Sequence, residues 1–369
     1  MPVFSSKVSG AGAASAASLW RVVGALGLAV QLLTPRLAQA DASASVDITL
    51  NADGQRLAEE LGLDLEGFQQ DVSDKVAGAL QISEVQRFLR SFANATSFSN
   101  RGIGVDYASN SDRFILGLAT NLAVSADLGD EGDDDVPTVG VAPNFTLMGG
   151  VNLRRWRHPE LTVFANLFHY NADSGELHGG VTSLGLHAQY KLFTPTRGQK
   201  RLLVQWGGLD FTGGVELARW KLGLYGDLSH DFTFTGAAGT SSTVEATVSG
   251  RFDVGATTVT LPLEVTTNVR LLYLLSLYVG GGLDLQVGEA SIGAGTSGAL
   301  RGTSPTAPDT FETIGEVSAR ASGENSPSLL GYHVLLGVQA NLWRLKIFAQ
   351  ASVQPISDVS VATGVRLVL

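Results

Sequence analysis

The sequence predicts an all-β protein: an antiparallel transmembrane β-barrel of about 12 strands (10–14), with a short N-terminal helical segment. The first observation behind this is that apolar residues alternate with small or polar ones from Phe114 to the C-terminus. The second is the composition, with 16% charged residues, 44 glycines and a mean hydropathy of +0.16. The third is that after residue 40 no run of about 20 apolar residues could form a membrane-spanning helix.

The composition also excludes several classes of protein. Soluble domains carry about 25% charged residues and about 7% glycine, so this chain is unlike an ordinary cytosolic enzyme. A formal net charge of −10 argues against nucleic acid as a partner. The sequence has no cysteine, which excludes disulfides, thiolate metal sites and a cysteine-linked lipid anchor.

Residues 1–40 have the features of a cleavable signal peptide. Lys7 and Arg21 supply positive charge, "VVGALGLAVQLL" supplies an apolar core, and "AQA" at 38–40 supplies small residues for cleavage. The alternative is a single transmembrane anchor, but the apolar run is too short to span a bilayer as a helix. We therefore expect export, with cleavage before Asp41.

Residues 41–111 form a second predicted region, with apolar residues at helical spacing. The pattern predicts two or three short amphipathic helices, whose apolar faces need burial. The residues that carry it are Leu57, Leu61, Leu65, Phe68, Val72, Val76 and Leu80. Two positions are open for this region, a plug in or beneath the barrel lumen and a periplasmic segment, and we favour the plug.

Residues 112–369 form the predicted barrel. In the first strand Leu116 and Leu118 share a face, while Gly117 and Ala119 lie on the other. The expected strands are 113–127, 138–153, 160–170, 179–193, 200–210, 214–234, 243–254, 257–270, 277–288, 329–342, 345–354 and 359–369. Segment 214–234 could hide a turn, and 312–322 could form a further strand.

The connections between these strands set the expected orientation. Barrels of this class have short periplasmic turns and longer extracellular loops. Placing the C-terminus on the periplasmic side puts the breaks near 153–160, 194–199 and 343–344 on that side. The acidic 128–137, the turn near 171–178 and the long stretch 289–328 then become extracellular loops.

With its signal, alternating strands and a last strand that runs to the terminal residue, the sequence resembles Gram-negative outer-membrane β-barrel proteins. The resemblance implies location in the outer membrane of a Gram-negative bacterium, contact with outer-membrane lipid and insertion by the barrel-assembly machinery. The chain ends in Leu369, where members of this class usually end in an aromatic residue. Two segments, "SLGLHAQYKLF" and "VQWGGLDFTGGVEL", also resemble barrel-like surface proteins of spirochaetes described as adhesins.

The candidate site is a set of polar side chains on the face opposite the lipid-facing residues. These expected lumen-lining residues are Arg251, Glu264, Asn268, Arg270, Asp284 and His333. They could pair with one another in a plugged barrel, or line a solute path with charges of both signs. Both interpretations hold together if the helical segment sits inside the barrel, because about twelve strands leave room for a helix.

No catalytic, metal or cofactor site is predicted. The acidic residues between 130 and 135 do not have the spacing of an EF-hand and fit a solvated loop. Ser183 and His187 lie four apart on one strand, but no third member of a catalytic triad is identifiable.

Two functions remain. The first is passive or gated passage of small solutes through a partly plugged, porin-like lumen. The alternative is a surface-displayed, adhesin-like barrel whose extracellular loops bind a partner. The sequence names neither the solute nor the partner, and it sets no oligomeric state.

Overall fold

The computed structural model describes residues 41–61, 66, 70, 74, 83–109, 114–127, 138–193, 203–235, 241–304, 307–355 and 357–369. The predicted signal peptide (1–40) and the acidic run (130–135) lie outside the described residues, as does most of the helical pattern between 62 and 82. No helix within the described ranges is long and apolar enough to cross a membrane.

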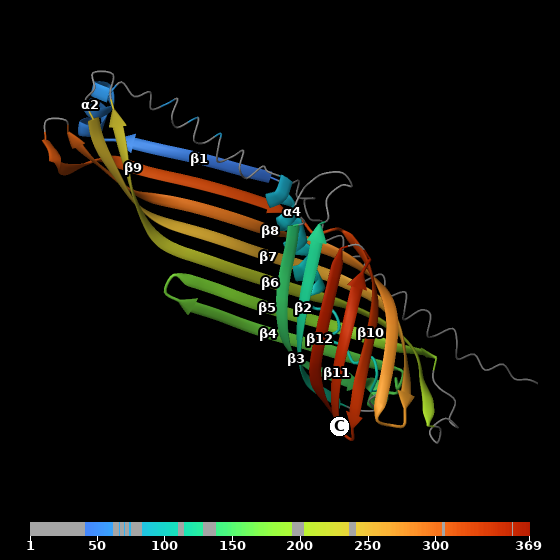
Figure 1. Cartoon of the computed structure of the whole chain (residues 1–369). Helices are drawn as coiled ribbons and strands as arrows, with labels where there is room; N and C mark the ends of the chain where they lie inside the picture. Colours follow the sequence, from blue (N-terminus) through green and yellow to red (C-terminus); the bar gives the residue numbers. More distant parts are fainter. Residues whose placement is uncertain are drawn as a thin grey trace, which may run out of the picture. The chain divides into compact units, whose positions relative to one another are not determined.

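The described elements are mostly long antiparallel strands (Figure 1). In chain order they are β1 (Asp41–Leu50), α2 (Ala52–Leu61), α4 (Ser83–Phe98), β2 (Phe114–Asp127), β3 (Thr138–Asn152), the short 3-10 helix η1 (Leu153–Trp156), β4 (Leu161–Ser174), β5 (Leu177–Phe193), β6 (Val204–Thr235), β7 (Ser241–Leu271), β8 (Leu275–Ser304), β9 (Ala307–Asn325), β10 (Leu330–Leu342), β11 (Leu345–Gln354) and β12 (Asp358–Val368).

The barrel is a closed ring of described strands, in the order β2-β3-β4-β5-β6-β7-β8-β10-β11-β12. β12 pairs back with β2 from Asp358 opposite Ser125 to Val368 opposite Ile115, which closes the ring. Closure leaves no unpaired strand edge around the ring, which is what a hydrocarbon environment requires of a sheet.

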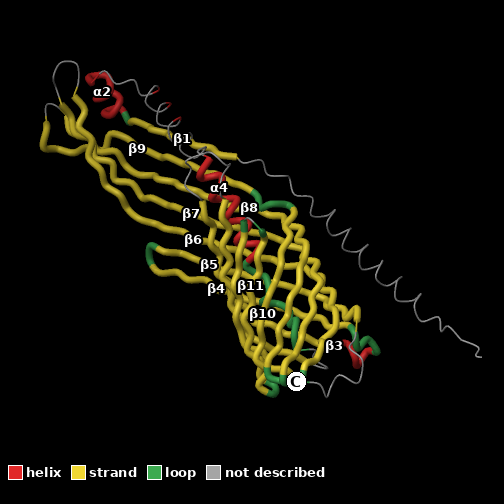
Figure 2. The backbone as a smooth tube through the Cα atoms, turned by 45° about the vertical axis from the view of Figure 1, so that its right-hand side comes forward, coloured by secondary structure: helices red, strands yellow, loops and turns green. Residues whose placement is uncertain are grey.

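The remaining strands extend the sheet beyond one end of the ring. β8 has two neighbours along the same edge: its residues 275–285 pair with β10, and its residues 290–304 pair with β9. β1 then pairs with the other edge of β9. We call this extension the distal sheet (Figure 2); it consists of β1, β9 and residues 219–235 of β6, 241–257 of β7 and 289–304 of β8.

Side chains in the ring alternate between the interior and an apolar outer surface. In β10, Leu335 is fully buried whereas Leu336 is 62% exposed. The outward residues include many large apolar ones, such as Leu118 at 59% and Leu283 at 54% exposure. A closed barrel with such an outer surface is suited to lipid, not to water.

The apolar outer surface ends at a definite row of residues. Leu217, Val259 and Val287 lie opposite one another on β6, β7 and β8, facing outward. Two residues further along, the outward positions are Arg219, Thr257 and Glu289. The same faces remain polar through the distal sheet, so this row marks one edge of the lipid-facing band.

The predicted fold class is confirmed, but several predicted strand limits are wrong. Segments 200–210 and 214–234 are one strand, β6, and 243–254 and 257–270 are one strand, β7. Gly213 and Gly255, which lie at the predicted breaks, both stay paired in the sheet. The predicted loop 289–328 is largely strand, namely the distal part of β8 together with β9. Outside the membrane neither face must be strongly apolar, so the alternation that marks the barrel strands fades there.

The interpretation of residues 41–111 also needs a correction at its start. The predicted helical region begins at residue 41, but residues 41–50 form strand β1. The signal was present, because Val46, Ile48 and Leu50 alternate with polar Asp47 and Thr49. The helical pattern further along corresponds to α2 and α4 among the described residues.

Helix α2 packs on the distal sheet at the end remote from the ring. The Asn51 side chain caps the helix by accepting hydrogen bonds from the backbone N–H groups of Asp53 and Gly54, at 3.0 and 2.9 Å. Leu57 then packs with Val244 and Ile314 in a small apolar cluster. This cluster, together with a 2.6 Å hydrogen bond from Asn51 Nδ2 to the Thr313 carbonyl of β9, holds α2 on the distal sheet.

Candidate functional site

The candidate site lies inside the ring, where helix α4 leads into the lumen. Leu89 and Phe92 on α4 pack with Ala256 of β7 and Ala290 of β8. On the other side α4 lies against β3, where a Cβ on Gly140 would sit 2.3 Å from the Phe92 nitrogen. Glycine at this position is what allows the helix to touch the barrel wall.

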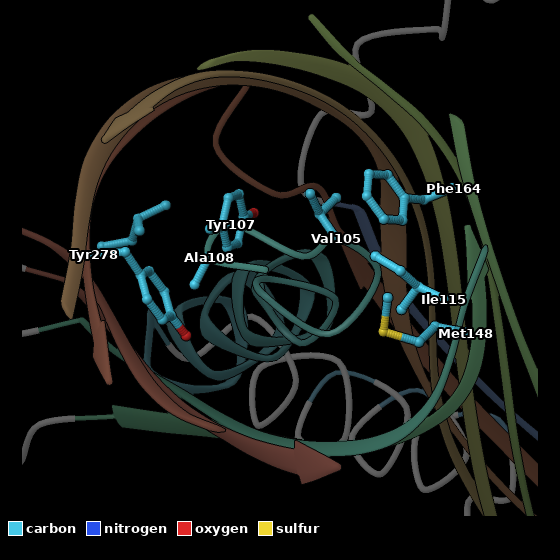
Figure 3. Packing of buried hydrophobic residues seen from close by; sticks show 8 residues of the cluster. Val105, Tyr107, Ala108, Ile115, Met148, Phe164 and Tyr278 are labelled. Atoms are coloured by element: carbon cyan, nitrogen blue, oxygen red, sulfur yellow. The ribbon is translucent and has the colours of Figure 1, made fainter. Parts of the chain in front are cut away.

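After α4 the chain continues through the lumen as a buried, irregular segment. We call residues 99–109 the lumenal segment; each of them is buried. The Ser99 hydroxyl donates to the Thr96 carbonyl at 2.8 Å, and Gly102 adopts a left-handed φ of 77° that turns the chain. Viewed along the barrel, the strands encircle this part of the chain (Figure 3).

Arg101 joins two walls of the lumen through ion pairs. Its guanidinium lies 2.6 Å from a Glu216 carboxylate oxygen on β6 and 2.8 Å from an Asp284 carboxylate oxygen on β8. The three side chains are 3% exposed or less. Buried charges of this kind are tolerable only when they are paired, so each partner depends on the others.

A second set of contacts extends this cluster to β7 and β10. His333 of β10 lies 2.8 Å from Asp284 through Nδ1 and 3.1 Å from Glu264 through Nε2. The Tyr107 hydroxyl, from the lumenal segment, donates to Glu264 at 2.7 Å. We call Arg101, Tyr107, Glu216, Glu264, Asp284 and His333 the lumenal ion cluster.

Amide side chains fix the lumenal segment on the side of β2 and β3. Asn121 donates from Nδ2 to the carbonyls of Ser99 and Arg101, at 2.8 and 3.1 Å. Asn144 donates to the Asn100 side-chain oxygen at 2.7 Å. The backbone carbonyls of Ser99 and Arg101, which follow the end of α4 and have no partner in the helix, thereby accept hydrogen bonds inside the barrel.

Near the end of the ring that carries the C-terminus, Arg366 of β12 holds the segment. It donates to the Val105 carbonyl at 2.7 Å and to Asp106 at 3.3 Å. Its guanidinium also lies 3.6 Å from the Phe348 ring centroid. Arg366 thus fixes this end of the segment through both charge and stacking.

Apolar contacts complete the packing in this region (Figure 3). Val105, Tyr107 and Ala108 pack against side chains that point inward from several strands. Those partners are Ile115, Met148, Phe164, Tyr278 and Leu335. The lumen is therefore occupied by both a polar and an apolar interface with the chain's own segment.

The structure brings five of the six predicted lumen-lining residues to this segment. Glu264, Asp284 and His333 belong to the lumenal ion cluster. Asn268 donates to the Tyr107 carbonyl at 2.9 Å, and Arg270 donates to the Ser109 carbonyl at 3.5 Å.

Arg251 lies apart from the other five. It is on the distal sheet, with its side chain 61% exposed and paired with Asp253. The sequence predicts a strand that ends at 254, whereas β7 runs from Ser241 to Leu271 and carries Arg251 beyond the lipid-facing band, so this residue does not line the lumen.

Sequence reasoning missed Arg101, Tyr107, Glu216 and Arg366. A signal existed for Glu216 and Arg366, since each is an isolated charge inside an apolar strand, on the face opposite the lipid-facing residues. Arg101 and Tyr107 lie in the stretch "RGIGVDYASNSD", where no periodicity indicates a side-chain direction.

Ser183 and His187, weighed above as possible catalytic partners, are used structurally. The Ser183 hydroxyl donates to the Asn100 side chain at 2.7 Å, and His187 lies 3.5 Å from Glu216. The Ser183 proton is therefore directed at the lumenal segment. Within the described residues no group of three or more acidic or histidine side chains is arranged to hold a metal ion.

Comparison with solved structures finds similarity to outer-membrane proteins. The translocator domain of the autotransporter NalP from Neisseria meningitidis is 10% identical, with 82% of this chain and 95% of that chain covered and a TM-score of 0.27. A Pseudomonas aeruginosa FadL homologue is also 10% identical, with 70% and 90% covered and a TM-score of 0.22. Ail, the attachment invasion locus protein of Yersinia pestis, is 11% identical, with 69% and 99% covered and a TM-score of 0.19.

No curated protein is significantly similar to the chain in sequence. A family model described as Lsa36-like, however, matches residues 64–369, which include α4, the lumenal segment and the whole ring. The closed ring and its apolar outer surface are those of a transmembrane β-barrel. The resemblance to outer-membrane barrels, and to spirochaete surface barrels in particular, is confirmed. The chain belongs to the Lsa36-like family.

Proposed function

We propose that the protein is a closed outer-membrane barrel that displays the distal sheet at the cell surface, where the sheet binds partner molecules. The observation that carries this proposal is the bridge from Glu216 through Arg101 to Asp284, which ties the lumenal segment to strands on two walls. A lumen crossed in this way supports a closed barrel better than an open pore. In this proposal the lumen-lining residues serve to hold the segment.

The distal sheet supports the display role. It continues past the last outward apolar row, and residues 289–304 of β8 alone extend it by about 50 Å at roughly 3.3 Å per residue. The ring end remote from it has the short connections Leu272–Leu274 and Trp343–Arg344 and the C-terminus. Short turns are typical of the periplasmic side, which supports a position of the distal sheet outside the cell. Insertion by the barrel-assembly machinery is part of this proposal.

The test is conductance across a planar lipid bilayer. Wild-type protein should give no steady open channel, because the lumenal segment fills the ring. The variant Arg101→Gln removes the positive charge that bridges Glu216 and Asp284, so it should give transient openings. Arg301→Gln, in an exposed ion pair with Glu245 at 3.8 Å on the distal sheet, is the control and should stay silent. A steady open channel in the wild type would overturn the proposal.

Gated passage of small solutes is the second candidate, and the nature of the lumen wall favours it. Many of the buried side chains facing the segment are polar, among them Asn121, Asn144, Ser183 and Asn268. Such a wall would remain wettable if the segment withdrew, as a gate requires.

A disulfide that locks the segment would separate the two functions. The Asn100 and Ser183 side chains already touch at 2.7 Å, and the chain has no cysteine of its own. In the double variant Asn100→Cys/Ser183→Cys, passage predicts solute flux into vesicles that is lost on oxidation and restored by reductant. The closed barrel predicts no flux in either state.

A further inference from the structure

The outward face of the distal sheet carries a hollow of about 490 Å³, and none of its lining residues takes part in the contacts of the lumenal segment described above. Four strands line it: β1, β9, β8 and β7. Their register sets the arrangement, because Arg251 lies opposite Gly295, which lies opposite Arg320. In the next row Asp253 lies opposite Gly293, which lies opposite Ser322.

The two glycines form the floor of the hollow. A Cβ built on Gly293 would meet no atom within 4 Å, and one on Gly295 would meet only the Ala319 carbonyl oxygen at 3.8 Å. Neither glycine has a φ that only glycine adopts comfortably. Glycine is therefore not needed here for the strand itself, and its effect is to leave space above the sheet.

Charged and hydroxyl groups form the rim. Arg251 is held by Asp253 in a two-bonded ion pair and lies 5.4 Å from the Tyr225 ring centroid. Across the floor, Arg320 is exposed, and within the described residues its guanidinium has no hydrogen-bond or ion-pair partner. Ser43 and Ser322, whose hydroxyl oxygens are 2.9 Å apart, close the side next to it.

We propose that this hollow binds an acidic saccharide, meaning a sugar that carries one carboxylate or sulfate group. Arg320 would pair with the anionic group. Asp253 would accept hydrogen bonds from sugar hydroxyls, and the serine hydroxyls can both donate and accept. A carboxylate on the rim and a net charge of −10 on the chain oppose a polyanion such as a nucleic acid.

The position of the hollow also favours a sugar over a lipid headgroup. Gly293 and Gly295 lie six and eight residues beyond Val287, the last outward apolar position on β8. At 3.3 Å per residue this is about 20–26 Å along the strand, above the layer of headgroups. This step rests on the proposed function, since it takes the distal sheet to face the cell exterior.

The test measures binding to the full-length protein in detergent micelles by titration calorimetry. The probes are a disaccharide containing glucuronic acid, neutral maltose, and sodium sulfate. We expect saturable binding of the acidic disaccharide, with maltose and sulfate each about tenfold weaker or more, since each lacks part of the recognition.

Two variants and two matched controls locate the site. Arg320→Gln should raise the dissociation constant about tenfold or more, and Gly295→Leu should abolish binding by filling the floor. The first control, Arg301→Gln, changes a different arginine, which lies on the outward face of β8. The second, Gly226→Leu, changes a glycine of β6 that also has open space around it. Both controls should bind as the wild type does, and heat-dependent gel mobility confirms that each variant is folded.

Three outcomes would overturn the proposal: no saturable binding of the acidic disaccharide, equal binding of sulfate alone, or unchanged binding by Arg320→Gln. Micelle binding does not depend on which side of the membrane the distal sheet faces. Protease accessibility of the distal sheet on intact cells tests that orientation separately, so failure of the proposed function and failure of this site are distinguishable.

Discussion

Arg101 shows how a single residue can decide the state of the lumen. It is fully buried, yet it carries a charge that would be very costly there without Glu216 and Asp284. The carboxylates depend on Arg101 in the same way. The three residues therefore act as one unit, which joins the lumenal segment to β6 and β8.

Replacing Arg101 with methionine should lower the free energy of unfolding by about 3–5 kcal/mol, because two buried carboxylates lose the charge of Arg101. Urea unfolding in lipid vesicles, followed by tryptophan fluorescence, measures this. Arg301→Met, on an exposed ion pair, should change stability by about 0.5 kcal/mol or less. Equal effects at the two positions would mean that Arg101 does not anchor the segment.

Among the elements, α4 depends on a glycine in the strand beside it. In Gly140→Val the added side chain would collide with the Phe92 backbone, so we expect α4 to leave the wall at a cost of about 1–3 kcal/mol. Limited proteolysis should then cut between residues 83 and 98. On the same strand, a Cβ at Gly149 meets its nearest atom, Leu116 Cδ2, at 3.7 Å. Gly149→Val should therefore protect α4 as the wild type does, and cleavage of both variants would reject this packing.

The outward apolar band predicts that the destabilisation caused by a charge on β7 depends on the depth of that position in the membrane. Leu263→Arg puts a charge on the lipid face and should destabilise the barrel by roughly 2–4 kcal/mol if it lies near the midplane. Thr257→Arg lies on the same face just beyond the band and should cost about 0–1 kcal/mol. Unfolding titrations of both variants provide the measurement. Similar costs at both positions would contradict the edge placed between Thr257 and Val259.

The ring could be predicted from the sequence because the membrane imposes a contrast on each strand. Leu118 and Leu336 face lipid while Ala119 and Leu335 face inward, and repetition of that contrast marks the strands. In the distal sheet this contrast between the two faces weakens. The sequence therefore predicts a loop for the stretch that contains Gly293 and Gly295. The lumenal segment has neither the helical nor the strand period of apolar residues. Only three-dimensional packing shows that Arg101 contacts Glu216.

For the whole molecule, the structure predicts that removing the lumenal segment opens the barrel more than deleting the helices does. Deleting residues 50–95 removes α2 and most of α4 but leaves the lumenal segment with its partners. Replacing residues 99–109 with a glycine–serine linker removes Arg101 and Tyr107 themselves. Single-channel recordings should therefore show a larger conductance for the linker variant. A larger conductance for the deletion would mean that α4, at the mouth, is the principal barrier.

The path of the chain through the ring has a consequence for assembly. β1 pairs with β9 beyond one end of the ring, whereas β2 begins beside Leu369 at the other end, and the lumenal segment (99–109) lies inside the barrel between them. A ring that had already closed could be filled only by pulling β1 and α2 through it. Unless β1 and α2 pass through a closed ring, the lumenal segment must therefore lie in place before β12 pairs with β2. Once β12 has paired with β2, the lumenal segment can leave the ring only if β1 separates from β9 or β12 separates from β2. Its release should therefore be slow.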